Sequence, residues 1–145
     1  MPRSLTLLML LILCTCMRHA DAQNYAHFCD IKPAMKNEWL EEAGIRVANK
    51  KAGQMGCREE FKRATIVSPE WELFYDCGTL VGRKIHMEVY GETWEGQCGV
   101  THFIFKQKYL GHHEYGNLRC DFMGDFYDMD CESGHDWKES RYQDQ

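Results

Sequence analysis

The spacing of apolar residues changes once along the chain. From Pro33 onward, apolar residues recur at intervals of three and four positions. They are Met35, Trp39, Leu40, Ala43 and Val47. This spacing predicts an amphipathic helix that opens near Pro33, buries these side chains on one face and stops at Gly53 and Gly56.

After this helix the apolar period becomes two, which is typical of half-buried strands. Ile85, Met87 and Val89 alternate with Lys84, His86 and Glu88, and Trp71, Leu73 and Tyr75 alternate with Glu70, Glu72 and Phe74. The predicted strands span residues 70–77, 80–90, 100–106, 109–115 and 118–123, with a Gly-rich turn over 91–99 and an extended segment over 23–32. One N-terminal helix packed on an antiparallel sheet makes an α+β domain.

The first 22 residues have the organisation of a secretory signal peptide. Arg3 supplies a positive start, residues 5–16 are apolar and uncharged, and Ala20-Asp21-Ala22 gives the small-x-small pattern that signal peptidase reads. Cleavage is therefore expected before Gln23. A membrane anchor is the weaker alternative, because the apolar run is shorter than the ~20 residues that a spanning helix needs. We expect a secreted, extracellular protein.

The charge of the mature chain bears on its partners. Removing residues 1–22 lowers Lys+Arg from 17 to 15 and Asp+Glu from 22 to 21, so the net charge goes from −5 to −6. An acidic protein is repelled by phosphate backbones and anionic lipid, which disfavours RNA and membrane partners. The roughly 120 remaining residues fit one domain, expected to be a monomer.

Eight cysteines become six once Cys14 and Cys16 leave with the signal peptide. The six are Cys29, Cys57, Cys77, Cys98, Cys120 and Cys131. An even number in a small exported domain predicts three disulfides, and the sequence leaves fifteen connectivities open. Zinc is the competing use, but structural zinc sites favour close Cys pairs, and no two of these cysteines lie within ten residues of each other.

The C-terminal residues 124–145 differ in character from the rest, being acidic, aromatic and rich in turn formers. We expect a loop-like extension tethered by Cys131. The predicted organisation is a signal peptide over 1–22, a domain over 23–123 and an acidic extension over 124–145.

The order of elements and three short stretches resemble a known family. The stretches are Gly99-Val100-Thr101-His102-Phe103-Ile104-Phe105, Tyr109-Leu110-Gly111 and Leu118-Arg119-Cys120. Over residues 25–123 the chain resembles the small guanyl-specific fungal ribonucleases. It is more similar to the ribonuclease-like secreted effectors of plant-pathogenic fungi, which keep that fold and usually lose the catalytic residues. The resemblance implies a Cys29–Cys120 disulfide, whereas the other four cysteines and the acidic extension depart from the family pattern.

The resemblance also implies catalytic roles. In such ribonucleases a carboxylate takes the 2′ proton of RNA, a histidine protonates the leaving 5′ oxygen, and a cation stabilises the phosphorane. Glu72 corresponds to the base, and His112 or His113 to the acid. His102 stands where the family has a phosphate-binding arginine, and a histidine offers no fixed bidentate fork. The Tyr–His segment expected ahead of Glu72 has no counterpart, so the catalytic set is incomplete.

The strand pattern gives these residues a simpler interpretation. Glu72 and Glu88 belong to the solvent faces of amphipathic strands. His86 and His102 are placed to face each other across strands, and the adjacent His112 and His113 point to opposite faces, which disfavours chelation of one ion. We expect no metal and no other cofactor.

Three functions are consistent with the sequence. The first is a secreted effector, a virulence protein without enzymatic activity that binds a host protein, either outside the cell or after delivery into a host cell. The second is an active endoribonuclease that cleaves RNA by 2′-hydroxyl transesterification. The third is an unrelated small disulfide-rich toxin or inhibitor.

Overall fold

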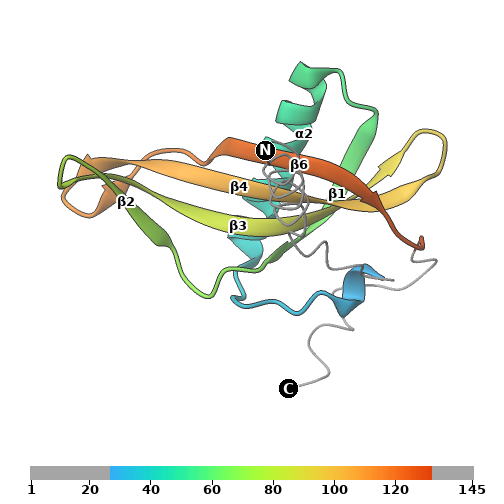
Figure 1. The fold of residues 1–145 in the computed structure, drawn as a ribbon, viewed down its shortest axis with the longest axis horizontal. Coiled ribbons are helices and arrows are strands. Elements are labelled where there is room, and N and C mark those ends of the chain that lie inside the picture. The colour runs from blue at the N-terminus through green and yellow to red at the C-terminus, as the bar shows by residue number, and fades with distance from the viewer. Residues whose placement is uncertain (1–26, 132–145) are drawn as a thin grey trace, which may run out of the picture.

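The computed structural model describes residues 27–131 as one helix packed on a curled antiparallel sheet (Figure 1). The elements are η1 (Phe28–Asp30), α2 (Glu38–Met55), β1 (Glu59–Ile66), β2 (Glu72–Asp76), β3 (Thr79–Thr93), β4 (Cys98–Gly111), β5 (Glu114–Tyr115) and β6 (Arg119–Asp128). The predicted α+β class is confirmed. The predicted signal peptide, residues 1–22, lies outside the described residues.

The two longest strands form the middle of the sheet. β3 and β4 pair without interruption from Gly82 with Lys108 to Glu92 with Cys98. β1 and β2 share the other edge of β3, β1 along its second half and β2 along its first. β6 and the short β5 pair with β4. Successive side chains on β3 and β4 therefore point alternately toward α2 and toward the opposite face, which we call the open face.

The helix begins at Glu38 rather than near Pro33, because Asn37 caps it: its Oδ1 accepts a hydrogen bond from the Leu40 N–H at 3.0 Å. Gly56 ends the helix in the left-handed conformation (φ 70°), as predicted. Trp39, predicted to be buried, is 67% exposed, because the face toward the sheet is centred on its neighbour Leu40. Gly44 lies on that face, where a Cβ would stand 2.7 Å from the Met87 sulfur, so its lack of a side chain allows close packing.

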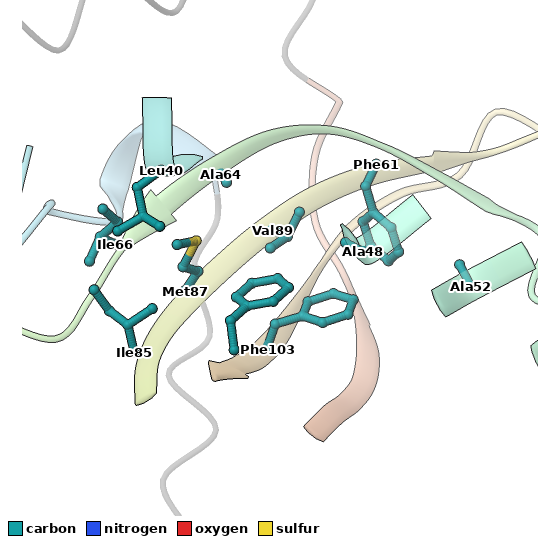
Figure 2. Packing of buried hydrophobic residues seen from close by; sticks show 11 residues of the cluster. Leu40, Ala48, Ala52, Phe61, Ala64, Ile66, Ile85, Met87, Val89 and Phe103 are labelled. Carbon is teal, nitrogen blue, oxygen red and sulfur yellow. The ribbon is translucent and has the colours of Figure 1, made fainter. Parts of the chain in front are cut away.

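The main core lies between α2 and the sheet (Figure 2). Its fully buried members include Ile66, Ile85, Met87, Val89, Phe103 and Phe105. The rings of Phe61 and Phe103 meet edge to face with centroids 5.2 Å apart, and those of Phe103 and Phe105 stack at 5.4 Å. The predicted burial of the apolar set on β3 is confirmed.

A smaller apolar cluster closes one end of the open face. Phe28 and Ile31 pack there with Tyr90, Cys98 and Val100, and the rings of Phe28 and Tyr90 lie 5.7 Å apart. Residues 23–32 were expected to be extended, but Phe28–Asp30 forms a 3₁₀ turn. The Asp30 carboxylate accepts a hydrogen bond from the His27 N–H, which stabilises the turn that buries Phe28.

β1 is a strand that the alternation of apolar residues did not predict. A bulge between Phe61 and Arg63 interrupts its period of two. At this bulge Asn49 of α2 donates a hydrogen bond to the Phe61 carbonyl and accepts one from the Phe61 N–H, both at 2.8 Å. The helix side chain thereby satisfies the backbone groups of Phe61.

Three further expectations are corrected by the strand pairing. β3 continues through Gly91 to Thr93, where a turn was predicted. β6 runs to Asp128, so the predicted boundary at residue 123 falls within a strand. The predicted strand over 109–115 is instead the end of β4, a turn and β5.

The burial pattern of β2 is the reverse of the one predicted. Leu73 and Tyr75 are 48% and 59% exposed, while Phe74 packs against Gly82. The reason is that β2 pairs only with the first half of β3, and the buried residues of α2 lie against β1 and the second half. The apolar side chains of β2 therefore have no helix to pack against.

Residues 27–131 contain one disulfide, Cys98–Cys131, where the sequence predicted three. It forms because the end of β6 returns to the start of β4: the Met129 N–H bonds to the Cys98 carbonyl, and the two cysteine Cα atoms lie 5.2 Å apart. The expected tether at Cys131 is thus present.

The Cys29–Cys120 bond that the resemblance implies is not formed, and Cys120 is a free thiol. Cys29 belongs to η1, whose Phe28 packs on the open face, while Cys120 packs against the main core on the α2 side. Cys57 and Cys77 are also thiols. They lie at opposite ends of β3, on the order of 40 Å apart, and so cannot bond to each other.

Candidate functional site

Four titratable side chains form a row across the open face. They are Glu72 of β2, His86 and Glu88 of β3, and His102 of β4, and we call them the histidine row. The strand register explains the arrangement: Glu88 lies directly opposite His102, and Glu72 lies opposite Lys84, the open-face neighbour of His86. Four residues that are scattered in sequence thus lie on one face within two strand spacings.

The contacts along the row are short. His102 Nδ1 lies 2.8 Å from Glu88 Oε1, and His86 Nδ1 lies 3.1 Å from His102 Nε2. At the other end, His86 Nε2 lies 3.3 Å from Glu72 Oε1, but it has no partner in hydrogen-bonding geometry among residues 27–131. The row is therefore an ordered chain of carboxylate, imidazole, imidazole and carboxylate with one incomplete link.

The hydrogen-bonding capacity of the rings explains the incomplete link. A carboxylate only accepts, so His102 Nδ1 must carry the hydrogen that points to Glu88. In the neutral ring Nε2 then accepts, and His86 Nδ1 must donate to it. A neutral His86 is left with a bare Nε2 facing Glu72. Adding one proton to His86 Nε2 allows it to donate a hydrogen bond to Glu72. The row then has a complete set of hydrogen bonds and one additional positive charge.

Burial disfavours the protonation of His86. Desolvation lowers the pKa of His86, with His102 and Lys84 acting in the same direction and Glu72 opposing them. The His86 side chain is 24% exposed, compared with 47% for Glu72. His86 is accordingly neutral in the folded protein at neutral pH, and the row gains its extra proton only on acidification.

This shift predicts a pH dependence of stability. An unfolded histidine titrates near pH 6.5, above the folded value, so the unfolded state binds more protons as the pH falls. The stability contributed by His86 is present above pH ~7 and is lost as the pH falls through 6.5 toward the folded pKa. His86→Gln is expected to reduce the loss of unfolding free energy between pH 7.5 and 5.0 in urea titrations. Equal losses in both chains would contradict this account.

The structure brings together two of the four predicted site residues. Glu72 and His102 both lie in the histidine row, connected through His86. His112 and His113 lie in the exposed β4–β5 turn with φ of 51° and 63°. Lys106 of β4 lies in the same cross-strand row as Glu72, and His112 and His113 come six and seven residues after Lys106. The two histidines are therefore about 20 Å from Glu72 along the strand direction, too far to act with it.

The two lysines that lie beside the row on the open face are paired with carboxylates. Lys84 Nζ lies 3.2 Å from Glu72 Oε2, and Lys106 pairs with Asp121 of β6. Arg83 points to the other face, where its guanidinium lies between the rings of Trp71 and Tyr115, 4.1 Å and 3.9 Å from their centroids. Burial lowers the pKa of Arg83. Neither Lys84 nor Lys106 is therefore free to hold a phosphate group at the row.

His86 and Glu88 are the members of the row that were not predicted as site residues. Their i, i+2 spacing on β3, with a histidine on the next strand, was the available signal. The expectation that His86 faces His102 across the strands is confirmed. Within residues 27–131, no three His, Cys, Asp or Glu side chains converge to hold a metal ion. In the same part of the chain no helix has the length and apolar character to cross a membrane.

Comparison with known proteins identifies no relative. No protein-family model matches the chain, and no curated protein or solved structure shows significant similarity to it.

Proposed function

We propose that this protein is a secreted effector that acts by binding a partner protein through the open face of its sheet. The observation that carries this proposal is the histidine row. Its hydrogen-bonding groups are directed at one another, and the neighbouring lysines are paired with Glu72 and Asp121. A catalytic set needs donors and acceptors directed at a substrate.

The β6 edge supports binding through the same face. Phe122 and Tyr127 are opposite Ile104 and Val100, on the open side of β4, and are 50% and 48% exposed. Half-exposed aromatic side chains are enriched in protein interfaces, where they bury large areas at small entropic cost. Together with the titratable row they give this face both apolar and polar contacts for a partner.

The partner class and the location rest on the sequence. The pattern of residues 1–22 supports export, and the resemblance to ribonuclease-like effectors supports a host protein as partner, met after delivery into the host cell. N-terminal sequencing of the exported protein is expected to begin at Gln23. A start at Met1 would contradict export by signal peptidase.

The binding proposal is tested with immobilised mature protein and extracts of candidate host tissue. A partner is expected to be retained by the wild-type chain and by Trp39→Asp, which changes an exposed aromatic residue on α2, but lost with Phe122→Asp plus Tyr127→Asp. Retention by the double variant would place the binding surface elsewhere.

An active endoribonuclease is the second candidate, favoured by one observation. Glu72 and two histidines lie together on an open sheet face, which supplies a base and an acid for transesterification. Incubation with guanine-containing RNA in EDTA tests it. The first proposal expects no cleavage. Cleavage that Glu72→Gln and His102→Gln abolish, but His113→Gln leaves unchanged, would instead establish the enzyme.

A further inference from the structure

A pocket of about 460 Å³ lies between the second half of α2 and the start of β6. Four helix residues and four consecutive residues before and within β6 line it: Val47, Lys50, Lys51, Gln54, Asn117, Leu118, Arg119 and Cys120. This volume falls in the range of small-molecule sites. The pocket is on the α2 side of the sheet, so it is separate from the histidine row.

The charge of the lining is its most informative property. Lys50, Lys51 and Arg119 are cationic, and none of the eight residues is acidic. Within residues 27–131 no carboxylate forms an ion pair with any of these three cations. In a chain of net charge −5, such a local excess of positive charge is a focus for anions.

The rest of the lining defines what the anion must carry. Gln54 and Asn117 provide amide donors, while Val47, Leu118 and Cys120 pack against the main core and form an apolar wall. We propose that this pocket binds a small amphiphilic anion, meaning a carboxylate, sulfonate or phosphate joined to an apolar body. Lys50 and Lys51 of α2 hold the charged group, and the apolar wall contacts the rest.

Cys120 contributes to the wall and is a weak nucleophile at neutral pH. Its thiol lies 3.4 Å from the Phe122 carbonyl, to which it donates, and burial raises its pKa, so it is protonated at neutral pH. Its position nevertheless makes it a reporter, because a ligand in the pocket would cover it. Cys77, an exposed thiol in the β2–β3 turn, serves as an internal control.

The first test uses 1-anilinonaphthalene-8-sulfonate, an aromatic sulfonate, followed by fluorescence. We expect one saturable site, competition by dodecanoate, and no binding of the neutral analogue N-phenyl-1-naphthylamine at the same concentrations. Lys50→Glu plus Lys51→Glu is expected to weaken binding by about tenfold or more. Lys32→Glu, an exposed control before α2, is expected to change it less than about twofold. Equal binding by the double variant would overturn the proposal.

The second test uses the wild-type chain alone, so it holds even if the double variant fails to fold. Iodoacetamide labelling of Cys120 and Cys77 is followed by peptide mass spectrometry. Saturating sulfonate is expected to slow labelling of Cys120 about fivefold or more and to leave Cys77 unchanged. Unaltered labelling of Cys120 would place the bound anion outside this pocket. Neither outcome bears on the open-face proposal.

Discussion

Replacing Phe103 by alanine is expected to lower the free energy of unfolding by about 3–5 kcal/mol, as measured by urea denaturation. Phe103 is fully buried in the centre of the sheet and contacts the rings of both Phe61 and Phe105. Truncation removes its apolar area from the core and leaves a cavity, because α2 and the paired strands on either side of β4 restrict collapse. The lost ring contacts with Phe61 and Phe105 add to the cost of the lost apolar burial.

Phe122→Ala provides the matched control, because it removes the same ring from the neighbouring strand at a half-exposed site. We expect a loss below about 1 kcal/mol there. Similar losses at the two positions would mean that Phe103 is not in the packed centre of the fold. If both substitutions lower the free energy of unfolding by less than about 1 kcal/mol, the core between α2 and the sheet is loosely packed.

Cys98→Ser is expected to cost about 3–4 kcal/mol of unfolding free energy under non-reducing conditions. The disulfide closes a loop with a sequence separation of 33 between its cysteines, and cross-linking a loop of that length restricts the unfolded chain by this amount. Cys98 is also 3% exposed and packs with Phe28 and Tyr90, so the substitution places a hydroxyl among apolar groups. Urea titration with and without reductant separates these two contributions.

Cys77→Ser is the control for this prediction, since it changes a thiol to a hydroxyl at an exposed turn. A change within about 0.5 kcal/mol is expected. If Cys98→Ser and Cys77→Ser behave alike, the bond between Cys98 and Cys131 does not stabilise the fold. If a reductant lowers the unfolding free energy of the wild-type chain but not that of Cys98→Ser, the assignment of the bond is confirmed.

The sequence predicted the fold best where the apolar pattern is long and regular. Ile85, Met87 and Val89 alternate without interruption, and β3 with its burial follows from them. β1 was missed because its bulge shifts the pattern at Phe61 and because Asn49, twelve residues earlier, satisfies the bulged backbone. That contact depends on the helix crossing β1, which no local pattern encodes.

The candidate site was predicted only in part, for a similar reason. Glu72 and His102 were singled out one by one, but the row exists because β2, β3 and β4 pair in one particular register. The disulfide depends in the same way on the return of β6 to Cys98. Residue type and spacing identify the groups that can react or bond, whereas the strand register determines which of them meet.

The division of one sheet edge between β1 and β2 has a consequence for self-association. A long, flat edge strand offers an unbroken row of backbone groups with which another copy could pair and aggregate. Here that edge consists of two separate strands, each with a bulge, and the gap between them is bridged by Ser68, whose hydroxyl accepts from the His86 N–H. The β6 edge has two register shifts of its own. Within residues 27–131, neither edge of the sheet thus offers a continuous strand on which folded molecules could stack into fibrils.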